Sequence, residues 1–233
     1  MIHPRLIVFD LDGTLVDSLP DIAGALNRCL RDAGLATIDI DVVKSLVGGG
    51  VGELAEKALA LQTRPTPISA AQLADAIVAR YRAQPCIDTR PYDGIEAALD
   101  ACAAVGSQLC IITNKAGSVA RALVAALGWT GRFVAVIGDG DGHPRKPAPD
   151  AARTLLERFA ISAGATLVVG DGLPDLALAR ALGCRAAAAA WGYTDRDQLA
   201  AQAPAHLLDR PGQLIGLVGS ADPARSDPNL IGG

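Results

Sequence analysis

The sequence predicts an α/β protein with a mainly parallel sheet and an inserted block of helices. Continuous runs of apolar strand-forming residues, such as Leu6–Phe9, suit strands that are buried on both faces. After about residue 93, such runs alternate with segments of helical apolar spacing, which is the pattern of βαβ units. Residues 16–88 instead hold consecutive helical patterns without a convincing strand, so we expect a helical insertion there.

Helix signals divide the inserted segment. Asp17-Ser18 begins the first helical pattern and Gly34 ends it. The run Gly48–Gly50 breaks a second pattern, and Ser69 with Gln72 forms a capping-box signature. We therefore expect helices over about 19–33, 39–46, 52–61 and 69–84.

The second half contains the alternating elements of the sheet. Pro149 suits a first helical turn, and Gly106, Gly128 and Gly183 suit helix ends. The expected strands are 109–112, 133–137 and 167–169, with weaker ones at 184–190 and 205–208. The expected helices are 95–105, which Asp93-Gly94 precedes, 118–127, 149–159 and 174–182. Residues 219–233, rich in Ser, Asp, Pro and Gly, predict a flexible tail.

Composition excludes several classes of function. The 233-residue chain has a net charge of −4, which gives no basic field for nucleic acid. No apolar run approaches the roughly 18 residues of a membrane span, and no signal-peptide pattern begins the chain. The five cysteines are scattered without a C-x-x-C pair, as expected for free thiols in a reducing cytoplasm. We expect a cytoplasmic protein, a monomer or homodimer, without nucleic-acid or membrane partners.

Polar residues follow the expected strands at the sheet edge where open α/β sheets bind ligands. Such a set provides a nucleophile, carboxylates for Mg²⁺, and cationic and hydrogen-bonding groups for a phosphoryl group. The residues are Asp10, Asp12, Thr113, Asn114, Lys146, Asp171 and Asp175.

The first of these stretches is Asp10-Leu-Asp12-Gly13-Thr14. Gly13 lets the backbone turn tightly and approach a bound substrate, and the Thr14 hydroxyl can bond back to the turn. Because Asp and Gly are common turn residues, this stretch alone is also compatible with a simple turn. The remaining motifs favour the catalytic interpretation.

Four motifs in order resemble those of the haloacid dehalogenase superfamily of aspartate-nucleophile phosphatases. They are Asp10-Leu-Asp12-Gly-Thr, Thr113-Asn-Lys, Lys146-Pro-Ala-Pro-Asp150 and Gly170-Asp171-Gly-Leu-Pro-Asp175. The resemblance implies a Rossmann-like core, residues 1–15 and 89–218, with an α-helical cap over 16–88. Hinges are expected near 16–19 and 89–94, on which the cap would close over the site.

The resemblance also implies a role for each motif residue. Asp10 would attack phosphorus and form an aspartyl-phosphate, and Asp12 would serve as general acid and then base. Thr113 and the amide of Asn114 would bind the phosphoryl group. Lys146 would neutralise its charge and orient Asp10. Dehalogenases and phosphonatases lack an aspartate at the position of Asp12, which favours phosphate-ester chemistry.

The same resemblance implies a Mg²⁺ site. Its ligands would be the Asp10 carboxylate, the Asp12 backbone carbonyl and Asp171, with Asp175 as an outer ligand or a partner of Lys146. Many relatives carry Ser where this chain has Gly172. We expect that difference to alter local geometry without abolishing activity.

Finer features resemble phosphoglycolate phosphatases, in particular the Gly-rich stretch Gly48-Gly49-Gly50, which we expect to face the substrate. Lys44 and Lys57 are weighed as partners of a substrate carboxylate, but solvated helix faces explain most such lysines. His143 is interpreted as a surface residue, and Trp191-Gly-Tyr193 as a packing segment.

The predicted function is Mg²⁺-dependent hydrolysis of a small phosphorylated metabolite, with 2-phosphoglycolate as the favoured substrate. One alternative is the same chemistry on a sugar or amino-sugar phosphate. A second is a β-phosphoglucomutase-like isomerase, which shares all four motifs. A non-catalytic binding protein is a third, disfavoured by the intact Asp10, Asp12, Lys146 and Asp171.

Overall fold

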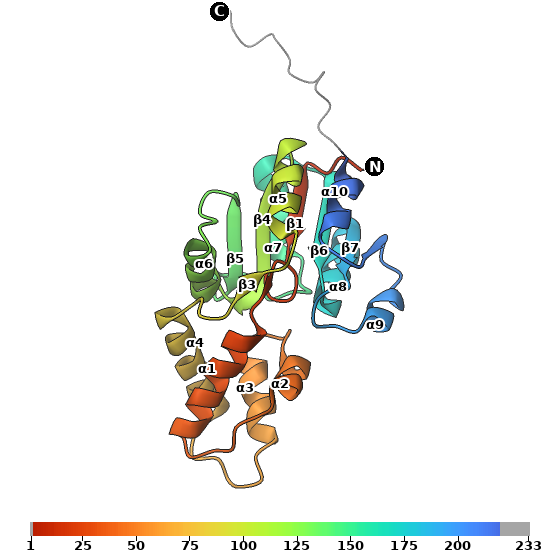
Figure 1. Cartoon of the computed structure of the whole chain (residues 1–233). Coiled ribbons are helices and arrows are strands. Elements are labelled where there is room, and N and C mark those ends of the chain that lie inside the picture. The colour runs from red at the N-terminus through yellow and green to blue at the C-terminus, as the bar shows by residue number, and fades with distance from the viewer. Residues whose placement is uncertain (1, 220–233) are drawn as a thin grey trace, which may run out of the picture.

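A six-stranded parallel sheet forms the centre of the larger part of the molecule (Figure 1). The computed structural model describes residues 2–219, so residues 220–233 of the expected tail lie outside the described residues. In spatial order the strands are β5 (Ala135–Asp139), β4 (Gln108–Ala116), β1 (Leu6–Phe9), β6 (Thr166–Gly170), β7 (Arg185–Ala189) and β8 (His206–Leu208). The predicted α/β fold class is confirmed.

Helices cover both faces of the sheet because the side chains of β1 are apolar in both directions. Ile7 and Phe9 face a cluster formed with helices α5, α6 and α10, whereas Leu6 and Val8 face one formed with α7, α8 and α9. These helices are α5 (Ile95–Ala104), α6 (Gly117–Ala126), α7 (Asp150–Phe159), α8 (Leu173–Leu182), α9 (Arg196–Ala200) and α10 (Gly212–Val218), and a 3₁₀ turn spans Ala163–Ala165.

Four further helices gather at one end of the sheet (Figure 1). They are α1 (Leu19–Asp32), α2 (Ile40–Leu46), α3 (Val51–Ala60) and α4 (Ala70–Ala83). Their apolar faces form a core of their own around Leu26, Leu54 and Leu73. The capping box of α4 is confirmed, because Ser69 Oγ accepts from Gln72 N at 3.2 Å and Gln72 Oε1 accepts from Ser69 N at 2.8 Å.

Two chain crossings join the helical insertion to the sheet. Strands β2 (Val16–Asp17) and β3 (Arg90–Pro91) pair antiparallel at this junction, which the sequence analysis did not predict. Beside them, the buried Asp21 carboxylate accepts hydrogen bonds from the backbone N–H groups of Ile87, Asp88 and Thr89 and from the Thr89 hydroxyl. The first residues of α1 therefore hold the returning strand.

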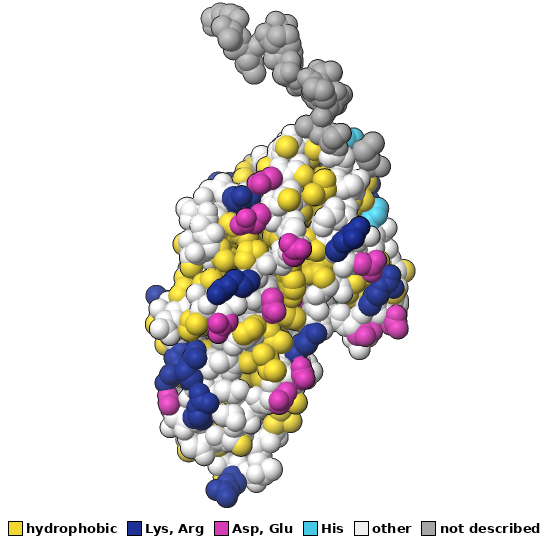
Figure 2. Space-filling model, in the orientation of Figure 1, with side chains coloured by type: hydrophobic (Ala, Val, Ile, Leu, Met, Phe, Trp, Pro, Cys, Tyr) yellow, Lys and Arg dark blue, Asp and Glu magenta, His cyan; other side chains and the backbone are white. Residues whose placement is uncertain are grey.

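The remaining differences from prediction concern short or shifted elements. Strand β5 begins at Ala135 rather than at 133, and α9 and α10 were not predicted. Among the described residues, no helix is both long and apolar enough to cross a membrane. All five cysteines are free thiols. Figure 2 shows acidic and basic side chains interspersed over the visible face of the described residues.

Candidate active site

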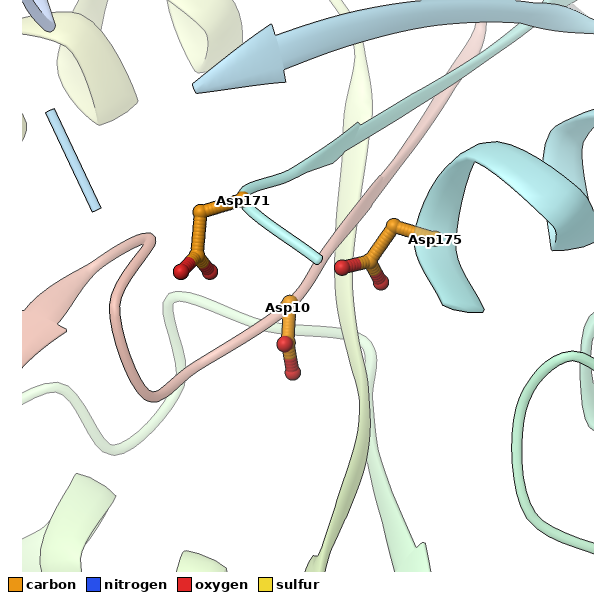
Figure 3. Close-up of side chains that lie close together, drawn as sticks. All are labelled: Asp10, Asp171 and Asp175. Atoms are coloured by element: carbon orange, nitrogen blue, oxygen red, sulfur yellow. The ribbon is translucent and has the colours of Figure 1, made fainter. Parts of the chain in front are cut away.

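Three aspartates converge where β1 and β6 end. Asp10 follows β1, Asp171 follows β6, and Asp175 lies in the first turn of α8. Their carboxylates offer one oxygen each within 4.8 Å of one another. In Figure 3, Asp171 and Asp175 lie on either side of Asp10. The parallel pairing of β1 with β6 brings these residues together, because both strands end at the same sheet edge.

The electrostatics of this cluster favour a bound cation. Asp171 is buried, and burial together with the charge of Asp10 raises its pKa to about 7. The Oδ1 atom of Asp10 is buried without a hydrogen-bond partner in the described structure. Asp10 and Asp175 share the ammonium of Lys146, and among the described residues Asp171 has no cation within salt-bridge distance. Crowded carboxylate oxygens of this kind fit a hard divalent ion such as Mg²⁺.

Lys146 lies between two of these aspartates. Its Nζ atom donates a hydrogen bond to Asp175 Oδ1 at 2.7 Å. The same atom lies 2.8 Å from Asp10 Oδ1 and forms an ion pair with it, although the angles do not meet those of a hydrogen bond. Burial alone would lower the pKa of Lys146, but the charges of Asp10 and Asp175 raise it above its usual value. The ammonium is thus held charged beside Asp10. Asp175 also accepts from Gly172 N at 3.1 Å, so its side chain caps the start of α8.

Asp12 points away from the three-aspartate cluster. Its two carboxylate oxygens accept from Lys115 Nζ at 2.9 and 3.1 Å, and Oδ1 also accepts from the Ser18 hydroxyl. The side chain of Asp12 is therefore not among the grouped carboxylates, and only its expected backbone carbonyl contact with a metal stays a prediction. The sequence analysis assigned no role at the site to Lys115 or Ser18, although Lys115 stands in the Thr113-Asn-Lys motif. The spacing of the motifs gave no signal for this pairing.

Thr14 and Gly13 fix the orientation of Asp171. The buried Thr14 hydroxyl donates to Asp171 Oδ1 at 2.7 Å and accepts from the Asp171 backbone N–H at 3.0 Å. Gly13 has φ +80°, and a Cβ atom there would lie 2.3 Å from Asp171 Oδ2. Glycine is required because the loop passes directly against this carboxylate.

The Gly-rich stretch of the helical insertion reaches the sheet side of the site. Asn114 Nδ2 donates to the carbonyls of Gly48 at 3.0 Å and of Lys146 at 3.2 Å. Arg145 Nη1 donates to Gly49 O at 2.5 Å, a contact that the sequence analysis did not anticipate. Two backbone carbonyls of the stretch thus receive hydrogen bonds from the strand side of the site.

The segment Trp191–Tyr193 is more than a packing element. Trp191 packs against the core as expected, and its Nε1–H donates to Thr14 O at 3.0 Å. Tyr193 also lines the cavity, and its backbone N–H donates to Asp171 Oδ2 at 2.8 Å. The interpretation as packing alone was incomplete. The available sequence signal was the glycine between two aromatic residues, which indicates a close approach of the backbone to another group. In the structure that group is Asp171, because a Cβ at Gly192 would lie 2.3 Å from Asp171 Cβ.

The site opens into a cavity of about 110 Å³ between the strand ends and helices α1, α3 and α4. Every carboxylate of the predicted site reaches it, together with Thr113, Asn114 and Lys146; Gly48 and Gly50 also line it, whereas Gly49 does not. Lys44 and Lys57 do not line this cavity, and Lys57 instead pairs with Glu53 at 2.5 Å. His143 is half-buried outside it.

Comparison with known proteins identifies the family. The model of the haloacid dehalogenase-like hydrolases matches residues 4–183. The chain belongs to this family. Proteins named phosphoglycolate phosphatase are similar over most of their length. The one from Aquifex aeolicus is 33% identical over 92% of this chain and 96% of its own, and the one from Rhodospirillum rubrum is 37% identical over 82% and 81%.

A solved structure shares the whole architecture of this haloacid dehalogenase-like hydrolase. A predicted phosphoglycolate phosphatase from Haemophilus somnus superposes with a TM-score of 0.88 at 27% identity, covering 94% of this chain and all of the other. These similarities confirm the expectation of a phosphoric monoester hydrolase.

Proposed function

We propose that this haloacid dehalogenase-like hydrolase converts 2-phosphoglycolate to glycolate and inorganic phosphate in a Mg²⁺-dependent reaction. The observation that carries the proposal is that Asp10 and Asp12 line one cavity. Asp10 lies with Lys146 and the grouped aspartates, whereas Asp12 lies apart with its carboxylate on the cap side. The two carboxylates thus have different surroundings, as a nucleophile and a general acid require.

The proposed reaction has two steps. A carboxylate oxygen of Asp10 attacks phosphorus, and the bond from phosphorus to the ester oxygen breaks as Asp12 protonates that oxygen. The alcohol leaves, and an aspartyl-phosphate remains on Asp10. Asp12 then takes a proton from water, whose oxygen attacks phosphorus and releases inorganic phosphate. Asp10 is regenerated as a carboxylate and Asp12 as an acid.

Surrounding groups bind the transferring phosphoryl group. Thr113 is buried within β4, and Lys146 holds a positive charge beside Asp10, so both are placed to contact phosphoryl oxygens. The residues proposed to hold Mg²⁺ are Asp10, Asp171 and Asp175, with the Asp12 carbonyl. The ion, when bound, supplies charge neutralisation for the phosphoryl oxygens.

We further propose that residues 16–88 act as a cap that excludes water and reads the leaving group. The cap side of the cavity carries apolar side chains such as Leu54 and Ile77. Because a sugar needs polar partners for its hydroxyl groups, this wall favours a small leaving group over a hexose. The same reasoning ranks the mutase alternative lower, since its substrates are also sugars.

Phosphate release from a panel of esters tests this proposal. The panel holds 2-phosphoglycolate, hexose 6-phosphates, an amino-sugar 6-phosphate and a nucleotide, each with and without Mg²⁺. We expect a strong Mg²⁺-dependent preference for 2-phosphoglycolate, and loss of turnover in Asp10→Asn. The exposed Asp75→Asn is the matched control and keeps wild-type activity.

Each contrary result removes a different part of the proposal. A preference for sugar phosphates would contradict the substrate while keeping the chemistry. Turnover in Asp10→Asn would contradict the aspartyl-phosphate mechanism. Exchange of phosphate between sugar positions without net release would favour the isomerase.

A further inference from the structure

We propose that Lys115 determines specificity by binding the anionic part of the leaving group. The inference rests on the proposed function and names the residue that distinguishes a carboxylate-bearing substrate from a neutral one. Lys115 lies at the end of β4, two residues after Thr113, and lines the cavity. Its side chain is only 8% exposed, so its charge acts within the cavity rather than in solvent.

The position of Lys115 matches the leaving-group side of the reaction. Its Nζ atom contacts both oxygens of Asp12, the residue proposed to protonate the departing oxygen. It also lies 4.1 Å from the ring centroid of Tyr81 on cap helix α4. The ammonium is therefore located between the general acid and the cap, where the leaving group must lie if the phosphoryl group occupies the side of Asp10 and Lys146.

Of the cations that line the cavity in the described part of the chain, Lys115 is the one available to pair with an anionic leaving group. Among the residues that the structure describes, two cations line the cavity, and one of them, Lys146, already pairs with Asp10 and Asp175. Among the described residues of the cap, those that line the cavity carry no charged side chain. Lys44 and Lys57, the cap lysines considered from sequence, do not reach it. A carboxylate on the leaving group would otherwise be buried against apolar walls without a counter-ion, which is strongly unfavourable.

Lys115 also keeps donor capacity for a ligand. An ammonium has three N–H donors, and the observed hydrogen bonds of Lys115 Nζ all go to Asp12. These two contacts leave the third N–H donor of Lys115 available for a ligand in the cavity. The ring face of Tyr81 contacts the ammonium without bringing a negative charge that would neutralise it.

Replacing the lysine separates recognition of the anion from support of Asp12. The test compares kcat/KM for 2-phosphoglycolate with kcat/KM for ethyl phosphate, in which a methyl group replaces the carboxylate. In Lys115→Met we expect the ratio of the two values to fall ~10–100-fold, the loss typical of one hydrogen bond between charged groups. Lys115→Arg, which keeps the charge, retains most of the preference, and the exposed control Lys57→Met leaves it unchanged.

An equal fall for both esters in Lys115→Met would overturn the proposal, because Lys115 would then act only by orienting Asp12. Retention of the full preference would overturn it as well. If the wild type shows no preference for 2-phosphoglycolate, the substrate assignment fails separately. Binding then decides the role of the lysine. In an Asp10→Asn background, Lys115→Met should weaken the binding of 2-phosphoglycolate, measured by calorimetry, and leave the binding of ethyl phosphate unchanged. The same affinity for 2-phosphoglycolate with and without Lys115→Met would refute the inference.

Discussion

Gly192→Ala is the sharpest test of how the site is built, because the structure leaves no space for one methyl group. A Cβ atom at this position would lie 2.3 Å from Asp171 Cβ and 2.4 Å from the carbonyl oxygen of Gly13. Real Cβ contacts are essentially never below 3.0 Å, so at least 0.7 Å must open on the Asp171 side. The opposing atoms belong to the backbone and to the base of a side chain, which cannot rotate away.

The expected consequence is a displaced Asp171. A misplacement of about 1 Å in an active site can cost on the order of 10²-fold in rate. Forcing a methyl group into a packed region typically costs about 1–3 kcal/mol of stability. We therefore expect Gly192→Ala to lower kcat/KM for 2-phosphoglycolate by ~10²-fold, to raise the Mg²⁺ concentration required for half-maximal activity, and to reduce the free energy of unfolding by no more than a few kcal/mol.

The assay is phosphate release over a Mg²⁺ titration, with urea denaturation of each variant in parallel. Gly216→Ala is the matched control, because a Cβ there has no atom within 4 Å and the residue lies inside helix α10. That control should be fully active and equally stable or slightly more stable. Wild-type kcat/KM and Mg²⁺ requirement in Gly192→Ala would refute the claim that this glycine positions Asp171.

Three further variants probe other parts of the site. Thr14→Val removes the hydroxyl that both donates to and accepts from Asp171, so we expect 10–100-fold weaker Mg²⁺ activation, measured by metal titration of activity. Arg145→Met removes the hydrogen bond to Gly49 O and should raise KM several-fold with little change in the thermal midpoint, because the arginine is exposed. Burial opposes the ionised form of Asp21, but its four hydrogen-bond donors together lower its pKa below the ordinary 3.8. Asp21→Asn should therefore cost about 1–3 kcal/mol near pH 7 by urea denaturation, and the cost should shrink as pH falls below 3.8.

The sign of the Asp21 effect follows from linkage. A carboxyl whose pKa is lower in the folded than in the unfolded chain stabilises the fold at pH values above its unfolded pKa. The contribution disappears as both states become protonated. A stability difference between wild type and Asp21→Asn that grows on acidification would contradict this account. For Thr14→Val, unchanged metal activation would show that the Tyr193 N–H alone suffices to orient Asp171.

The sequence analysis correctly predicted the helices and strands that have a local pattern, such as an apolar run or a capping box. The apolar run Leu6–Phe9 forms β1 with the expected bounds, since a strand buried on both faces is apolar throughout. The capping box at Ser69 marked the start of α4 correctly. Strand β7 is Ala-rich and was predicted only as a weak strand, yet tertiary burial between β6 and β8 holds it in the sheet.

The parts that sequence reasoning missed depend on contacts between distant residues. The β2–β3 pair joins Val16 with Pro91, and a two-residue strand has no periodicity to detect. The Lys115–Asp12 pair links residues 103 positions apart and requires β4 to lie beside β1. Lys115 stood inside a recognised motif, but a motif gives residue order and not the direction in which a side chain points.

Tyr193 connects the two regions that the sequence analysis treated separately, the hinge and the carboxylate cluster. Its backbone N–H holds Asp171 Oδ2 at 2.8 Å, while its hydroxyl accepts from Ser18 N at 2.9 Å and donates to Asp17 Oδ1 at 3.2 Å. Asp17 belongs to β2, one of the two crossings into the cap. A rotation of the helical insertion about this crossing would therefore move or break the contacts of the Tyr193 hydroxyl. Because the backbone of the same residue contacts Asp171, the position of the helical insertion and the orientation of that carboxylate are linked through Tyr193.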